Sequence, residues 1–125
     1  MTTLGAIGNP ISTVVAKVNG SMEVTGDITA FSASDLTLKE NVNPIMDALQ
    51  KVNLISGNTF DWNNTSPREG SETGVIAQEI ESLGLPGVVK LREDNTYGVR
   101  YERLVPLLIE AIKELSTKVD DLSNK

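Results

Sequence analysis

The C-terminal end of the chain carries apolar residues at alternating spacings of four and three. This heptad seam consists of Tyr101, Val105, Leu108, Ile112, Leu115, Val119 and Leu122. Such spacing is typical of a helix that packs on partner helices through a narrow stripe, and the residue types mildly favour two strands. Pro106 fits only a first helical turn, so the helix is predicted to begin near Arg103 or Leu104. Two interpretations stay open: a terminal helix packed on its own domain, and self-association through a coiled coil.

Composition limits the partners and the chemistry. The chain has 125 residues and a net charge of −6, and no basic run offsets that charge, which argues against nucleic acid as a partner. No apolar stretch is long enough to span a bilayer and the N-terminus lacks the regions of a signal peptide, so no membrane partner is expected.

Cysteine and histidine are both absent. Their absence excludes disulfides, Cys/His zinc sites and Ser-His-Asp triads, and no metal site is predicted. Any covalent catalysis must therefore use a Ser or Thr nucleophile, with a base that is a lysine, a carboxylate or an N-terminal amine.

The N-terminal segment has the pattern of short strands. Residues 12–18, 21–25 and 28–31 are β-branched or alternating, and Asn19-Gly20 is a strong two-residue turn signal. Strands this short bury little by themselves. Two interpretations remain: a β-hairpin packed on the rest of the chain, and the end of a fibrous β-structure whose partners are other chains.

The middle of the chain mixes helical and strand patterns. In order, we predict a helix over 42–52, a strand over 54–62, a polar loop over 63–71, a helix over 73–83, and strands over 88–91 and 97–101 joined by a hairpin loop. Asn43 and Pro44 suit the start of the first helix, and Gly84 suits the end of the second. Phe60 and Trp62 share one strand face, which favours core packing over a sugar-stacking platform.

Ser34 and Lys39 are a possible nucleophile and base. A serine needs an adjacent base, and a lysine can serve only if its pKa falls from about 10.4 toward neutrality. Residues five apart do not share a helical face, so a turn or extended segment must bring them together. From chemistry alone, the argument that this pair is catalytic is weak, because serines and lysines this close in sequence are common. The carboxylates Asp35, Glu40, Glu79 and Glu81 show no distinctive spacing, and solvated faces explain them better.

Three motifs in order resemble one known family. They are Ser34-Asp35-x-x-Leu38-Lys39-x-Asn41, Gly74-Val75-Ile76-Ala77-Gln78-Glu79, and the run from Tyr101 to Leu115. From Ser34 onward the chain resembles the intramolecular chaperone auto-processing domain of bacteriophage tailspikes, endosialidases and L-shaped tail fibres, which also occurs in the eukaryotic myelin regulatory factor. Many members carry Arg where this chain has Thr37, but the serine and lysine positions are intact.

The resemblance implies a self-cleaving serine endopeptidase. Such domains trimerise, guide the folding of the fibre ahead of them, and then cut themselves off just before the motif serine, here at Ala33–Ser34. By carry-over Ser34 is the nucleophile and Lys39 the general base, acting within one chain or between neighbours, with no cofactor. The motif positions without an assigned role are Asp35, Asn41, Gln78 and Glu79. For Glu79 a structural or orienting role is expected.

The resemblance also implies an organisation. Residues 1–33 would be the β-rich end of a fibre shaft and residues 34–125 the chaperone domain. The expected fold is α+β: a strand arm, a small mixed domain with β-hairpins and two short helices, and a long C-terminal coiled-coil helix, assembled as a homotrimer. The expected partners are other copies of the chain and its own upstream fibre. The mature part would belong to the virion tail fibre, and the chaperone would act in the host cytoplasm during assembly.

The alternative function is a structural trimerisation domain or receptor-binding tip that never cuts. The feature that separates the two is whether Ser34 and Lys39 meet near the Ala33 carbonyl.

Overall fold

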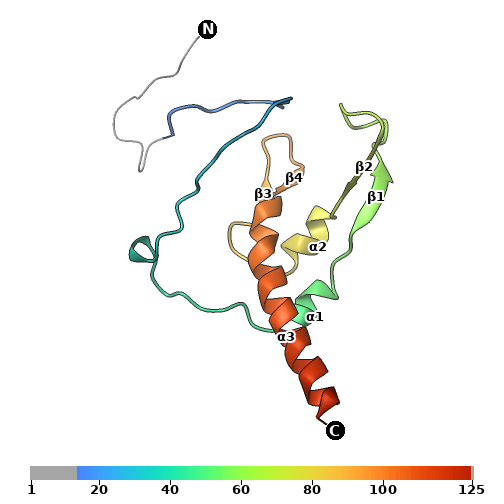
Figure 1. Ribbon diagram of the computed structural model, residues 1–125. Helices are drawn as coiled ribbons and strands as arrows, with labels where there is room; N and C mark the ends of the chain where they lie inside the picture. The colour runs from blue at the N-terminus through green and yellow to red at the C-terminus, as the bar shows by residue number, and fades with distance from the viewer. Residues whose placement is uncertain (1–13, 125) are drawn as a thin grey trace. The chain divides into compact units, whose positions relative to one another are not determined.

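The computed structural model describes residues 14–124, and the chain divides into two units, Met1–Glu40 and Asn41–Lys125. Within the described residues, the second unit holds every strand and every α-helix (Figure 1). It combines two antiparallel hairpins, two short helices and one long C-terminal helix, so the predicted α+β class is confirmed.

The elements follow one another along the chain as in Figure 1. In order they are a 3-10 helix over Leu36–Leu38, α1 (Ala48–Val52), β1 (Asn58–Asp61), β2 (Ser71–Gly74), α2 (Ala77–Glu81), β3 (Val89–Leu91), β4 (Tyr97–Val99), a second 3-10 helix over Tyr101–Leu104, and α3 (Val105–Ser123).

Each pair of strands forms its own two-stranded sheet. β1 pairs with β2 from Asn58 opposite Gly74 to Asp61 opposite Ser71. β3 pairs with β4 around Lys90 opposite Gly98, and the Arg92 N–H donates to the Thr96 carbonyl at 2.8 Å to close the loop. The β3–β4 hairpin therefore forms where the sequence predicts it.

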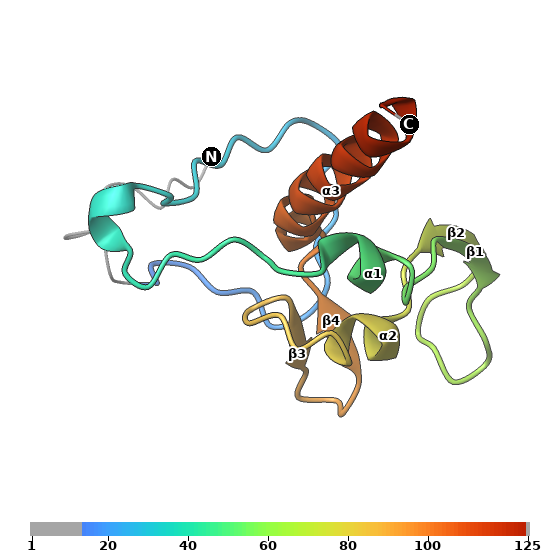
Figure 2. The same cartoon turned by 90° about the horizontal axis from the view of Figure 1, so that it is seen from below.

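α3 holds the core together through one face. Leu104, Leu107 and Ala111 are buried on the helical run and pack with buried residues from α1, α2 and the segment before β3. Those partners are Ala48, Ile80 and Val88. Figure 2 shows α1 alongside α3, and α2 beside the β3–β4 hairpin. The helix begins at Val105 with Pro106 in its first turn, close to the predicted start.

The heptad seam is a different face of the same helical run: Tyr101 lies in the preceding 3-10 helix, and the other six residues lie on α3. All seven seam residues, from Tyr101 to Leu122, are between 47% and 67% exposed. A single chain thus packs α3 on its own domain through Leu104, Leu107 and Ala111 and leaves the seam uncovered. Within residues 14–124, no helix has both the length and the apolar content to cross a membrane.

The predicted helix over 42–52 is wrong in its first half, because α1 starts only at Ala48. Asp47 adopts a left-handed backbone (φ 53°, ψ 40°), which a continuous helix excludes. Asn43 does not cap the helix; its amide donates to the Asn41 carbonyl at 2.9 Å. The cap comes from α3 instead, where the Glu114 carboxylate accepts from the N–H groups of Ala48 (2.7 Å) and Leu49 (3.4 Å).

The predicted helix over 73–83 is also too long, and the strand over 54–62 shrinks to β1. Thr73 pairs with Thr59 in the hairpin, so the chain is extended where a helix was expected, and α2 begins at Ala77. Gly74 is buried beneath Tyr101, whose hydroxyl accepts from the Val75 N–H at 3.0 Å. A Cβ at Gly74 would overlap that hydroxyl, so any larger residue here must displace the Tyr101 side chain.

The strands predicted before Ser34 do not form between Val14 and Phe31, and Ser12 and Thr13 lie outside the described residues. Every residue from Val14 to Phe31 is exposed. Without buried apolar surface, short strands lack the stabilisation that a sheet needs. The single chain therefore shows no β arm in this range.

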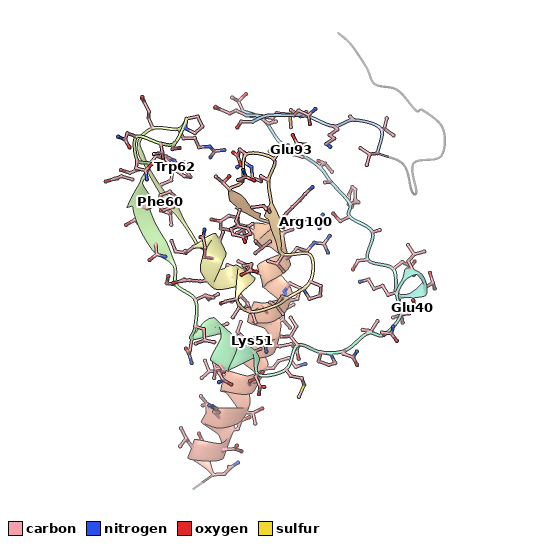
Figure 3. All side chains as sticks on the ribbon, turned by 180° about the vertical axis from the view of Figure 1, so that it is seen from behind. Glu40, Lys51, Phe60, Trp62, Glu93 and Arg100 are labelled. Carbon is pink, nitrogen blue, oxygen red and sulfur yellow. The ribbon has the colours of Figure 1, made fainter. Side chains whose placement is uncertain are left out.

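The two aromatic residues of β1 and its end lie outside the core. Phe60 and Trp62 pack edge to face with ring centroids 4.9 Å apart, and Figure 3 shows both on the β1–β2 hairpin. The Arg68 guanidinium lies 5.6 Å from the Trp62 ring centroid. The expected core packing is thus replaced by a small cluster that stabilises the hairpin itself.

Glu114→Gln is expected to lower the free energy of unfolding by about 1 kcal/mol, because it removes the anionic cap of α1. Urea unfolding followed by circular dichroism measures the change. Asp121→Asn, an exposed change on the same helix, is the control and is expected to stay within about 0.5 kcal/mol of wild type. Equal effects of both changes would contradict the capping role.

Gly74→Ala is expected to destabilise the fold by about 1–3 kcal/mol, because the new methyl group overlaps the Tyr101 hydroxyl. Gly57→Ala, where a Cβ meets nothing within 4 Å, is the matched control.

Tyr101→Phe removes the hydroxyl and its hydrogen bond, so the double variant should lose less stability than the two single losses added together. Strict additivity in urea unfolding would show that the overlap is not the cause.

Candidate functional site

Ser34 and Lys39 meet in an exposed turn at the end of the first unit. The Lys39 Nζ donates a hydrogen bond to the Ser34 Oγ at 2.8 Å. The turn ends just before Glu40, which Figure 3 labels. The structure thus brings the candidate nucleophile and base into direct contact, with Ser34 immediately after Ala33 in the chain.

Asp35 builds this turn. It is the N-cap of the 3-10 helix Leu36–Leu38, and its Oδ1 accepts from the Thr37 N–H at 2.8 Å and from the Thr37 hydroxyl at 2.7 Å. Two backbone bonds complete the turn: the Leu38 N–H donates to the Asp35 carbonyl at 3.0 Å, and the Lys39 N–H donates to the Leu36 carbonyl at 3.1 Å. Aspartate is common at such turns, because its short side chain can accept a hydrogen bond from the backbone N–H two residues further along the chain.

The electrostatics of the turn favour an ionised Asp35. The hydrogen bond from the Thr37 hydroxyl, then that from the Thr37 N–H, lower the pKa of Asp35 below its ordinary value of 3.8. The positive charge of Lys39 lowers this pKa further, by a smaller amount. The carboxylate is therefore charged at neutral pH, and at that pH it accepts both hydrogen bonds from Thr37.

Asn41 opens the second unit in a left-handed conformation, with φ 54°. Asparagine tolerates this region better than most residues, and the Asn43 amide holds the Asn41 carbonyl at 2.9 Å. The motif asparagine thus marks the residue where the turn segment passes into the folded unit.

Gln78 and Glu79 lie on α2 in the second unit. Gln78 is exposed. The Glu79 Oε1 accepts from the Ser56 N–H at 3.0 Å and from the Ser56 hydroxyl at 2.8 Å, and the Asn58 amide donates to the Ser56 Oγ at 2.8 Å. Glu79 thus ties α2 to the segment that leads into β1.

The residue that the sequence reasoning missed is Thr37, the partner of Asp35. The signal was present: an Asp or Asn followed two residues later by Thr forms the same double hydrogen bond elsewhere in the chain. Asn63 accepts from Thr65, and Asp94 accepts from Thr96, in both cases from the N–H and the hydroxyl. Among residues 14–124, no three His, Cys, Asp or Glu residues are grouped so that they could hold a metal ion.

Comparison with known proteins supplies the family. Residues 34–90 match the family model of Peptidase_S74, described as chaperone of endosialidase. The match begins at Ser34, the first residue of the turn, and spans the Gly74–Glu79 motif.

Two relatives extend the similarity. The long tail fiber proteins Gp37 of Enterobacteria phages K3 and T2 are each 34% identical to this chain over 116 residues. The alignment covers 86% of this chain and 9% of either relative, so the chain spans about a tenth of their length. The match over residues 34–90 and the similarity to the two tail fibre proteins together support a tail-fibre chaperone domain in this chain.

Proposed function

We propose that this chain is an intramolecular chaperone of a phage tail fibre, which assembles as a trimer and then releases itself by cutting the Ala33–Ser34 bond. The observation that carries the proposal is the 2.8 Å hydrogen bond between the Lys39 Nζ and the Ser34 Oγ, directly after Ala33. The match to a peptidase family model, which begins at Ser34, supports the same bond as the site.

The proposed chemistry uses only these side chains and water. The Ser34 Oγ attacks the Ala33 carbonyl, on its own chain or a neighbouring one, while the Lys39 amine accepts the hydroxyl proton. The amide bond breaks, its nitrogen takes up a proton, and an ester joins the Ala33 acyl group to the serine oxygen. Water then hydrolyses the ester and leaves a free carboxylate at Ala33 and a free amine at Ser34.

The base must be a neutral amine, and this requirement links cutting to assembly. Desolvation favours the neutral form of a lysine. Both Ser34 and Lys39 are exposed in the single chain. Packing of neighbouring chains around the turn would bury the amine, so that cleavage follows assembly.

The exposed heptad seam of α3 supports self-association. An apolar stripe this long on a solvated helix is a common sign of an interaction site. Its alternating spacing suits partner helices, and the buried face of α3 leaves it free for them. Three copies joined along this seam would form the proposed coiled-coil trimer.

The proposed location follows from the tail-fibre relatives. Residues 1–33 would end the shaft of the mature fibre in the virion tail, with their β-branched pattern completed by strands from neighbouring chains. Residues 34–125 would act during assembly in the host cytoplasm and then be lost.

Ser34→Ala and Lys39→Ala are each expected to leave the full-length chain intact, because each removes one member of the pair. The wild-type chain should instead accumulate a fragment that begins at Ser34. Intact-mass spectrometry after expression distinguishes the two masses. Ser32→Ala, a serine two residues before the site, is the matched control and should cut like wild type.

A wild-type chain that keeps its full mass after it has formed trimers would contradict the cleavage proposal. That result would favour a purely structural fibre tip.

Replacing Leu108, Ile112 and Leu115 with serine is expected to weaken the trimer and slow cleavage at least tenfold, because the exposed seam then loses its apolar surface. Lys113→Ser, on a part of α3 outside both apolar faces, is the control. Sedimentation velocity measures assembly, and gel densitometry measures cutting. A stable wild-type monomer that still cuts would refute the coupling of cleavage to assembly.

A further inference from the structure

The spacing between Ser34 and Lys39 is unfavourable for contact unless the chain reverses. Five residues of extended chain cover about 16 Å, whereas the two side chains meet at 2.8 Å. Positions five apart on an α-helix also point in different directions. The contact therefore depends on whatever keeps the intervening turn closed.

No apolar packing supports this turn among the described residues. Leu36 is 72% exposed and Leu38 is 68% exposed, and the 3-10 helix that they bound has no buried residue. Its conformation therefore rests on local hydrogen bonds. Two of these are backbone bonds that any sequence could make, and two come from the Asp35 carboxylate.

The two bonds made by Asp35 both end on Thr37. The N–H of Thr37 donates one and its hydroxyl donates the other, so a single residue donates both bonds to the Asp35 carboxylate. Hydrogen bonds to an ionised acceptor are roughly twice as strong as neutral ones. The Asp35–Thr37 contact is thus the side-chain interaction that fixes the turn between the serine and the lysine.

We propose that Asp35 and Thr37 are a positioning pair for the self-cleavage reaction: their contact closes the turn that places the Lys39 Nζ on the Ser34 Oγ. The inference rests on the proposed function above. Neither residue is required to touch the Ala33 carbonyl. They act through the backbone of Leu36–Leu38, by raising the fraction of chains in which nucleophile and base are paired.

The expected effects follow from what each substitution removes. Asp35→Ala removes a capping side chain, and it should slow cleavage by roughly three- to thirtyfold. Thr37→Val removes the hydroxyl but keeps the N–H, and it should slow cleavage by about two- to tenfold. Thr37→Ser keeps the hydroxyl and should restore a rate close to wild type.

Thr96→Val is the matched control. It removes the same kind of hydroxyl bond, from Thr96 to Asp94 in the β3–β4 loop, far from Ser34 in the sequence. It should leave the cleavage rate unchanged.

The experiment uses full-length chains made by cell-free synthesis with a labelling pulse and a chase. The fraction cut is followed over time for wild type and each variant, at several pH values from neutral to alkaline. Each substitution is also made in a Ser34→Ala background, in which assembly is measured by sedimentation velocity and secondary structure by circular dichroism without interference from cutting.

The positioning role predicts slower first-order cleavage for Asp35→Ala and Thr37→Val, rescue by Thr37→Ser, and unchanged assembly. It also predicts that Thr37→Val lowers the rate by one constant factor across the pH range, because the Asp35 charge beside Lys39 remains. A purely structural role would instead reduce assembly in parallel with the rate.

Two results overturn the inference while leaving the proposed function standing. One is a wild-type rate for both Asp35→Ala and Thr37→Val. The other is a loss of assembly that matches the loss of rate. A wild-type chain that is never cut contradicts the proposed function itself, and the inference with it.

Discussion

The structure depends on one helix that carries two apolar faces. α3 buries Leu104, Leu107 and Ala111 against its own domain, and this contact holds α1, α2 and the segment before β3 in place. The heptad seam lies on a neighbouring face and stays in solvent. Burial of this second face against other chains would be favourable, because it would remove apolar surface from water. The first face is enough to stabilise the fold of a single chain around the helix.

The candidate site is built on the opposite principle. It has no core and no buried residue in its 3-10 turn, and it is held by five short-range hydrogen bonds within six residues of chain. Such a turn needs no tertiary fold to form, so the pairing of Ser34 with Lys39 is available in the unassembled chain. What the isolated turn lacks is shielding from water, which a lysine base requires. In the proposed mechanism, the geometry of the site is therefore local, and assembly would supply the burial that the lysine needs.

The sequence predicted what depends on local patterns and missed what depends on distant contacts. The start of α3 followed from Pro106, and the β3–β4 hairpin followed from two strand patterns around a polar loop. The first helix was predicted about twice too long because its cap is Glu114, which is 66 residues away from Ala48. Thr73 and Gly74 were assigned to a helix because their strand partner and the overlying Tyr101 are set by tertiary packing. The pairing of Ser34 with Lys39 required a turn, and the Asp35-x-Thr37 signal for that turn was local but unused.

Glu114 shows how the two faces of α3 are connected. Its carboxylate caps α1 from the core side of α3, one residue before Leu115 of the seam. If the seam packed on neighbouring helices as proposed, a shift of α3 would act on the start of α1 through this carboxylate. The segment that precedes α1 runs back through Asn41 to the turn that carries Lys39. If the chain assembles along the seam as proposed, these hydrogen-bonded and covalent links would connect the seam to the turn that carries Lys39.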